Sequence, residues 1–306
     1  FIINIFVFMI GYCCINMTLA KEGVKVNRGM IKRTFLSKGL NYVSELILLN
    51  LEDTLKILEW NVENDILVYR MSSDSFPWMS EYEFEDLPNF ELIKSKLKLI
   101  GDFIKENKLR TGYHPSHFNV LASLNPSVVE KTIKELNKHA QIMDFMDLPK
   151  THYYPINIHV NITKPTKEES LERFCENFER LSESCKSRLT IENDDFANQY
   201  SVKDLYEGLY KKINIPIVFD QFHFLHGPQD QTMEEALKLS LTTWNVKPLT
   251  HMSSSKLLES NDTKIKKTAH SDYIYEDIET FGFDFDTELE CKQKELAVLK
   301  YKQKFI

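Results

Sequence analysis

The feature of this chain that most constrains its fold is a regular alternation of short apolar segments with longer amphipathic ones. Eight of the short segments are candidate strands. Three runs among them, at residues 156–158, 189–191 and 215–219, are rich in β-branched residues and bounded by turn residues, as buried strands are. The eight segments lie at residues 5–11, 66–70, 109–113, 155–160, 188–192, 216–220, 248–251 and 283–290. Helical patterns separate them, at residues 40–61, 90–107, 127–143, 168–185, 202–212 and 232–241. The alternation predicts an α/β fold, and the eight strands predict a single (β/α)8 TIM barrel.

The composition is that of a folded globular protein and indicates one domain over residues 1–306. The chain is 42% hydrophobic and 27% charged, with only 9 Gly and 10 Pro, which excludes disordered and collagen-like proteins. Five scattered cysteines without a CxxC pair indicate a reduced, intracellular protein, in the nucleus or the cytoplasm. The apolar segment 1–10 is too short to cross a bilayer. We therefore expect a first strand in this segment and no membrane partner. We also expect the protein to be a monomer.

Six consecutive predicted strands end in imidazole or carboxylate side chains. In chain order these are His114, His159, Glu192, Asp220 with His223, His251 and Glu290, and His270 lies between the last two strands. In an α/β barrel the carboxyl ends of all strands meet at one mouth, where active sites lie. Buried charged groups are costly without partners, so this cluster predicts bound metal ions at the C-terminal strand ends. Mixed imidazole and carboxylate ligands without cysteine suit Zn²⁺, Mn²⁺ or Fe²⁺.

Short motifs spread over nearly the whole chain resemble those of one known family. They are Gly11-Tyr12 through Asn16, Asn27-Arg28, Tyr69-Arg70-Met71-Ser72-Ser73, His114-Pro115, Ile156–His159, Ile191-Glu192-Asn193-Asp194, Val218–His223, His251, Ala269-His270, and Glu290 with Lys292. Each motif is weak alone, but their ordered set resembles the ultraviolet-damage endonucleases. That family is metal-dependent and related to apurinic endonucleases and xylose-isomerase-like barrels.

The resemblance implies two or three neighbouring divalent metal ions, most simply Mn²⁺, with Zn²⁺ or Mg²⁺ as alternatives. By position, His114, His159 and Glu192 would hold one ion. Glu192 would also bridge to a second ion, held by Asp220, His251 and Glu290, while His223 and His270 would hold the third. The resemblance also implies catalytic roles for Glu192, Asp220, Glu290 and Lys292.

The partner that the resemblance implies is damaged double-stranded DNA. The family nicks the phosphodiester on the 5′ side of ultraviolet photoproducts and of abasic sites, leaving a 3′ hydroxyl. Tyr12 and Asn16 would line the pocket for the flipped lesion, and His117-Phe118 stands where the family wedges a Gln-Tyr pair into the helix. Lysines of the segment after the seventh strand (Lys256, Lys264, Lys266 and Lys267) would contact phosphates in an otherwise acidic chain of net charge −7.

The chain departs from the family at the third metal. Family members carry a modified lysine two residues before the histidine of the seventh strand, and Leu249 occupies that place here. Lys247 lies two residues earlier still and would substitute only if the backbone bulged. Two alternatives stay open at this point: a sugar isomerase on a related metal-binding barrel, and a lesion-binding module that has lost catalysis.

Overall fold

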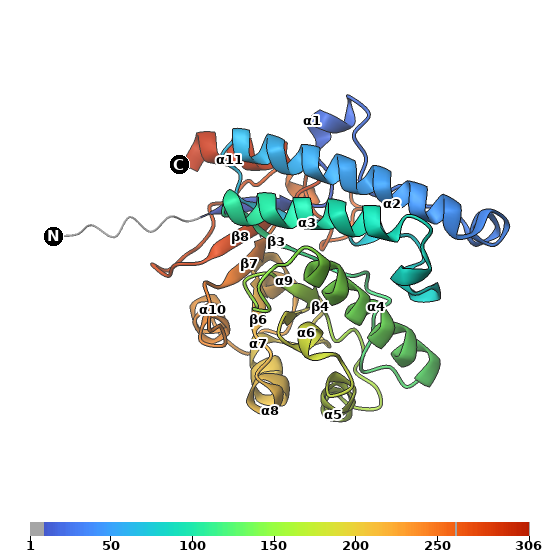
Figure 1. Cartoon of the computed structure of the whole chain (residues 1–306). Helices are drawn as coiled ribbons and strands as arrows, with labels where there is room; N and C mark the ends of the chain where they lie inside the picture. Colours follow the sequence, from blue (N-terminus) through green and yellow to red (C-terminus); the bar gives the residue numbers. More distant parts are fainter. Residues whose placement is uncertain (1–8, 261, 306) are drawn as a thin grey trace.

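The computed structural model describes residues 9–260 and 262–305, and its centre is a barrel of eight parallel strands (Figure 1). The strands are β1 (Ile10–Cys13), β2 (Val68–Arg70), β3 (Arg110–Gly112), β4 (Ile156–Ile158), β5 (Leu189–Glu192), β6 (Ile217–Asp220), β7 (Leu249–Met252) and β8 (Asp286–Leu289). They follow the order β3-β2-β1-β8-β7-β6-β5-β4. A parallel bridge between Tyr113 and Ile156 joins the two ends of this order, β3 and β4. The predicted α/β barrel is therefore confirmed.

Each predicted strand corresponds to an observed one; the observed strands are shorter, except that β7 has the predicted length and lies one residue later, at Leu249–Met252. The first differs most: it was predicted at 5–11, and β1 ends two residues later, at Cys13. Residues 5–8 of that prediction lie outside the described residues. The last was predicted from 283, whereas β8 begins at Asp286. This shift matters in β1, because side chains alternate between the two faces of a strand.

Helices and short helical turns connect the strands. The helices are α1 (Met17–Ala20), α2 (Lys32–Glu63), α3 (Phe90–Glu106), α4 (Pro126–Phe145), α5 (Lys167–Phe178), α6 (Glu183–Lys186), α7 (Val202–Leu205), α8 (Lys211–Ile213), α9 (Gln221–His226), α10 (Met233–Leu241) and α11 (Glu295–Phe305). The single-turn elements are the 3₁₀ helices η1 (Ser73–Ser75), η2 (Met79–Glu81), η3 (Phe84–Asp86) and η5 (Lys256–Leu258), and the π-helical turn η4 (Tyr206–Tyr210) between α7 and α8. Helices α2 and α3 run side by side along one flank (Figure 1).

Local sequence signals explain where the helices begin and break. The side chain of Asn125 caps α4 by accepting a hydrogen bond from the Ser127 amide, and Pro126 takes the first helical position. The predicted helix 168–185 is two helices, because the hydroxyl of Ser182 caps a new start by accepting from the amide of Cys185. The predicted helix 40–61 lies within α2, which Gly39 interrupts with a φ of 62°. Such a positive φ suits glycine, which has no Cβ to clash.

Polar residues fill the bottom of the barrel, at the amino ends of the strands. The guanidinium of Arg110 on β3 lies 2.9 Å from the carboxylate of Asp286 on β8, and both side chains are buried. The Nζ atom of Lys247 lies 3.0 Å from Asp286 as well. Lys247 thus precedes β7 and points to the opposite end of the barrel from the mouth. The bulge that Lys247 would need in order to replace the missing metal-binding lysine is not present, because β7 pairs with β8 in continuous register from Leu249 to Met252.

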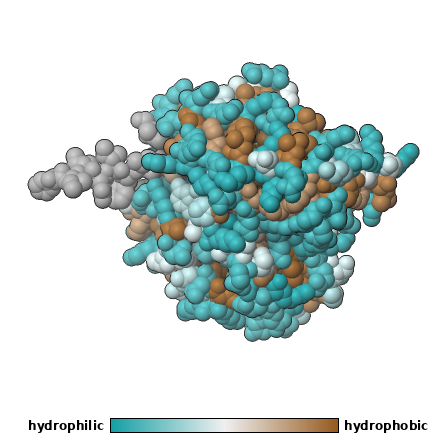
Figure 2. All heavy atoms as spheres, viewed as in Figure 1, coloured by the Kyte–Doolittle hydropathy of each residue, from teal (hydrophilic) through white to brown (hydrophobic). Residues whose placement is uncertain are grey.

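The face of the molecule seen in Figure 2 is predominantly hydrophilic. The face in Figure 2 shows apolar residues in small groups among polar ones. Among the described helices, none is both long and apolar enough to cross a membrane.

Candidate metal centre

The barrel mouth collects the eight predicted ligands. Glu192 and Asp220 are the last residues of β5 and β6, and His251 lies on β7. Four others follow strands directly or begin a helix, namely His114, His159, His223 and Glu290. His270 comes from the long segment after β7, which is held in place where Ser255 and His270 form an antiparallel bridge. The prediction that these side chains share one place in space is confirmed.

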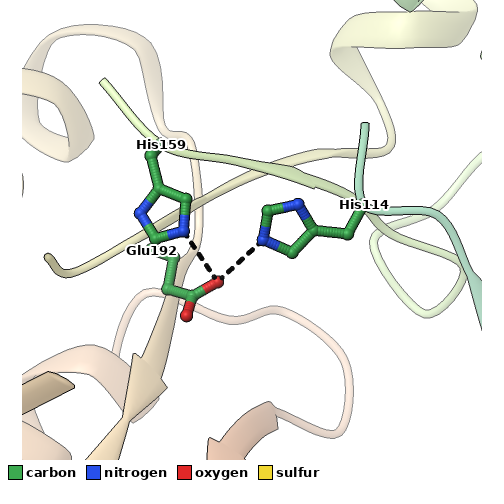
Figure 3. A group of neighbouring side chains, drawn as sticks. All are labelled: His114, His159 and Glu192. Atoms are coloured by element: carbon green, nitrogen blue, oxygen red, sulfur yellow. Dashed lines mark hydrogen bonds and ion pairs between the residues drawn. The ribbon is translucent and has the colours of Figure 1, made fainter. Parts of the chain in front are cut away.

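The first group consists of two histidines around one carboxylate (Figure 3). The Nε2 atom of His114 lies 3.2 Å from Oε2 of Glu192, and Nε2 of His159 lies 3.5 Å from the same oxygen. One ligand atom from each of these three residues lies within 4.8 Å of the others, so the group can hold a metal ion. The amide of Asn157 donates a hydrogen bond to Oε2 of Glu192 and orients it from below.

The second group surrounds the other side of Glu192. Its Oε1 atom lies 3.1 Å from Nδ1 of His223, and together with Asp220 these residues form another triplet able to hold an ion. On β7, Nδ1 of His251 lies 3.1 Å from Oε2 of Glu192 and 3.5 Å from Oε1 of Glu290. Glu192 therefore belongs to two of the groups that could each hold an ion.

The third group contains His223, His270 and Glu290, whose ligand atoms also lie within 4.8 Å of one another. The Nδ1 atom of His270 lies 3.7 Å from Oε2 of Glu290. Leu249 starts β7, is buried and offers no ligand, as expected for an alkyl side chain. This group therefore has three donors without a lysine.

Four histidines of the cluster contact a carbonyl or carboxylate oxygen through Nδ1, and Nδ1 of His223 lies 3.1 Å from Oε1 of Glu192 as well. His114 contacts the carbonyl of Pro115 at 3.2 Å, His223 the carbonyl of Asn193 at 3.0 Å, and His270 the carbonyl of Glu290 at 3.0 Å. His159 contacts Oδ1 of Asp194 at 2.9 Å. A carbonyl can only accept, so the contacting nitrogen carries the proton and the other nitrogen is free to bind a metal.

The electrostatics of the cluster are those of mutually stabilised charges. Burial alone would lower the pKa of His223 and His251, but the carboxylates around them, Asp220 and Glu192, outweigh it and raise both well above the usual value. Burial would raise the pKa of Glu192, but the histidines hold it well below its usual range. The pKa of His114 is lowered, because burial dominates there. Protons on histidine thus balance the acids, and metal ions would displace them.

The residues fit bound metal ions by a second criterion, which is the set of buried atoms left without hydrogen bonds. These atoms include Oε1 of Glu192, Oδ2 of Asp220 and Nδ1 of His251. Buried polar atoms are almost always paired, so unpaired ones concentrated at one point indicate a missing partner. Since all three are acceptors when unprotonated, a cation satisfies them together.

Sequence reasoning missed a buried arginine at this site. Arg70 ends β2, and its NH1 atom lies 2.6 Å from Oε1 of Glu290 and 3.5 Å from Oε2 of Glu288. The guanidinium keeps the pKa of Glu290 well below its usual range, against the effect of burial. Arg70 belongs to one of the family motifs listed above. The direction in which its side chain points depends on how β2 pairs with β1, and the spacing of residues along the sequence does not reveal that pairing.

The predicted wedge is in a suitable place. The sequence alone allows Phe118 to pack in the core or to protrude, and in the structure it is 74% exposed and so protrudes. Its ring centroid lies 4.1 Å from that of His117, so the two rings form one protruding unit. They belong to the loop after β3, the same loop that carries His114. A cavity beside them is lined by Trp78 and Val120 among others.

Tyr12 and Asn16 were expected to line the lesion pocket, but their side chains are buried and hydrogen-bonded within the protein. Tyr12 is fully buried; its hydroxyl donates to Asn61 of α2 at 2.7 Å and accepts from Asn16 at 3.0 Å. Asn16 is also buried and caps α1 through a hydrogen bond from the amide of Leu19. Tyr12 pairs in register with Tyr69 and so points away from the face that carries Arg70. Stacking of a base on Tyr12 does not fit this geometry.

The predicted phosphate-binding lysines differ in availability. Lys292, Lys264, Lys266 and Lys267 are exposed, and Lys292 stands outside the buried cluster. Lys256 is held by ion pairs with Glu259 at 2.6 Å and Asp272 at 3.0 Å. Its charge is therefore already balanced within the protein, and it is a poorer phosphate ligand than expected.

Comparison with known proteins matches this chain to one family of endonucleases. The family model for UV-endonuclease UvdE matches residues 8–305. The UV DNA damage endonuclease of Clostridium perfringens (strain 13 / Type A) is 32% identical over 300 residues, covering 95% of this chain and 69% of that protein. That of Bacillus thuringiensis subsp. konkukian (strain 97-27) is 34% identical over 267 residues, covering 83% and 80%.

Solved structures give the same assignment. The crystal structure of SacUVDE superposes with a TM-score of 0.83 at 31% identity, covering 97% of this chain and 98% of that one. The 3-keto-D-glucoside 4-epimerase from E. coli gives a TM-score of 0.57 at 7% identity, with 97% of each chain covered, and shows the shared fold alone. On the matched family model, the two relatives and the SacUVDE structure, this chain belongs to the UV-endonuclease UvdE family.

Proposed function

We propose that this protein is a metal-dependent DNA repair endonuclease that nicks duplex DNA on the 5′ side of ultraviolet photoproducts and abasic sites. The observation that supports it most is the convergence of three ligand groups on Glu192 and Glu290 at the barrel mouth. Family membership supports the substrate class, since the relatives are named UV DNA damage endonucleases.

The chain's own residues would hold two or three divalent ions, for which Mn²⁺ is our proposal. His114 and His159 would hold the first with Glu192. By the resemblance Asp220, His251 and Glu290 would complete the second: His251 lies beside Glu192 and Glu290, and Asp220 lies with Glu192 and His223. When bound, such ions lower the pKa of water and neutralise charge on a phosphodiester. Arg70 keeps Glu290 ionised and in place, and Asn157 orients Glu192, which the surrounding histidines keep ionised.

Lesion binding in this proposal rests on the exposed ring pair of His117 and Phe118. A damaged step costs less to unstack than an intact one, so an aromatic side chain that fills the vacated space selects for damage. Because the ring pair follows β3 on the loop of His114, a DNA helix engaged by Phe118 would lie across the barrel mouth. The exposed lysines 264, 266 and 267, after β7, would contact its phosphates.

The sugar-isomerase alternative loses its support. The matched epimerase shares 7% identity, which is evidence for the barrel and not for the chemistry. The complete set of buried ligands also argues against a lesion-binding module without catalysis, because unpaired buried carboxylates are costly unless a cation uses them.

The proposal is tested with duplex oligonucleotides that carry one pyrimidine dimer or one abasic site. Purified protein is incubated with Mn²⁺, with and without chelator, and both strands are mapped at nucleotide resolution. We expect a single nick 5′ of the lesion with a 3′ hydroxyl that a polymerase extends, and none with chelator. Lesion-selective binding without cleavage at any divalent metal would refute the nuclease proposal.

A further inference from the structure

The histidines of the metal centre share a rule that extends to a residue without an assigned role. In His114 and His159, Nε2 faces Glu192 while Nδ1 contacts a second oxygen. In His223 and His270, Nδ1 also contacts a carbonyl oxygen. An oxygen at that place fixes both the rotation and the protonated nitrogen of an imidazole. His251 is the fifth histidine, and its Nδ1 atom faces Glu192.

For His251, the oxygen beside the other ring nitrogen, Nε2, belongs to Glu288. The two residues are register partners on β7 and β8, so their side chains leave the same face of the barrel wall. The Nε2 atom of His251 lies 3.3 Å from Oε2 of Glu288, and both residues are almost fully buried. This 3.3 Å contact is an ion pair and not a complete hydrogen bond, and among the described residues neither Nε2 of His251 nor Oε2 of Glu288 has another hydrogen-bond partner. Each is therefore the nearest available partner of the other, with Arg70 as the second charge beside Glu288.

Arg70 explains how a third carboxylate is tolerated beside Glu192 and Glu290. Its NH1 atom lies between two acids, 2.6 Å from Glu290 and 3.5 Å from Glu288. A carboxylate oxygen with a fixed cation on one side can accept a hydrogen bond from an imidazole N–H on the other. Glu288 is therefore held from one side and contacts His251 from the other.

We propose that Glu288 is a positioning residue for the metal centre, which holds the proton of His251 on Nε2 so that Nδ1 faces the metal between Glu192 and Glu290. This inference rests on the proposed metal-dependent function. It assigns no ligand atom to Glu288, which acts through His251. It also accounts for a buried acid that none of the three ligand triplets includes.

The test measures metal affinity, which does not depend on turnover. Glu288→Leu, Glu288→Gln and wild type are titrated with Mn²⁺ by calorimetry, after circular dichroism has shown that each is folded. Loss of such an outer partner typically weakens metal binding about 10–100-fold, and we expect this for Glu288→Leu. Glu288→Gln should retain most of the affinity, because its amide oxygen still accepts from Nε2.

A matched control separates positioning from the general cost of removing a buried acid. Glu295 is also buried, but its carboxylate accepts from the amides of Met17 and Thr18 at the start of α1. Glu295→Gln should lower stability and leave Mn²⁺ affinity unchanged. A second readout is the ¹⁵N spectrum of Zn²⁺-loaded wild type, in which His251 should carry its proton on Nε2.

The outcomes are distinguishable from those of the proposed function. Wild type that binds Mn²⁺ and nicks DNA, with Glu288→Leu binding equally tightly, would overturn this inference alone. A proton on Nδ1 of His251 in the Zn²⁺-loaded protein would overturn it as well. Wild type that binds no divalent ion would overturn the inference and the metal-dependent function together.

Discussion

Removing the charge of Glu192 is the perturbation with the most consequences, because this one carboxylate links the ligand groups. Nitrogens of His114, His159, His223 and His251 lie 3.2, 3.5, 3.1 and 3.1 Å from its oxygens. Glu192→Gln preserves the volume and replaces one carboxylate oxygen by an amide. The substitution should therefore leave the barrel intact and impair every group that uses Glu192.

The magnitude follows from the number of ions affected. A ligand shared by two ions is lost from both, so we expect cleavage to fall by at least about 10³-fold, which is roughly 4 kcal/mol of activation free energy. In the metal-free protein the histidines would lose their counter-charge. Breaking a buried pair costs about 3–5 kcal/mol when the partner stays charged. Histidine can release its proton at neutral pH, so we expect about 1–3 kcal/mol, the cost of an unsatisfied buried group.

The assay is single-turnover nicking of a dimer-containing duplex at saturating Mn²⁺, with lesion binding measured separately in chelator. Asp195→Asn is the control, since Asp195 lies in the same loop and is only partly buried. We expect normal nicking by Asp195→Asn, and normal binding but no nicking by Glu192→Gln. Cleavage by Glu192→Gln within about tenfold of wild type, a difference of 1.4 kcal/mol, would refute the bridging role.

Three further predictions concern DNA contact and protonation. Phe118→Ala should weaken lesion-selective binding by about 1–3 kcal/mol, the usual value of one aromatic–base stack, and unchanged selectivity in a gel-shift assay would exclude the wedge. Reversing the charge of Lys264, Lys266 and Lys267 together should weaken DNA binding and flatten its salt dependence, and an unaltered salt slope would exclude these lysines. Because the pKa values of His223 and His251 are raised, their contribution to the stability of the metal-free protein is complete below about pH 6.5 and is lost as pH rises through the raised values. Mn²⁺ binding near pH 7 should accordingly release protons, and calorimetric enthalpies that do not change with the ionisation enthalpy of the buffer would contradict this.

The residues at the carboxyl ends of the strands were predictable from the sequence. The contacts that hold these residues from neighbouring strands were not. Apolar segments of the right length located Glu192, Asp220 and His251 at one mouth, because the barrel requires parallel strands to end together. Arg70 and Glu288 escaped notice because their roles depend on register, which places Arg70 beside Glu290 and Glu288 beside His251. Sequence spacing within one strand carries no information about the neighbouring strand.

Tyr12 and Phe118 illustrate two other limits. The predicted first strand ended at Gly11, whereas β1 runs to Cys13, and the alternation within β1 turns Tyr12 towards α2. A difference of two residues in where the first strand ends therefore decides whether Tyr12 lies after the strand, at the barrel mouth, or within it, in the core. For Phe118 the sequence left exposure undecided, because an aromatic residue after a strand packs inward as readily as it protrudes. Its 74% exposure settles that point.

The most direct test of the account is the location of metal ions in crystals soaked with Mn²⁺, by anomalous diffraction. We expect at least two anomalous peaks at coordination distance from Glu192. One should also be close to His114 and His159, and the other close to His251 and Glu290. Crystals with full Mn²⁺ occupancy elsewhere and none among these side chains would contradict it.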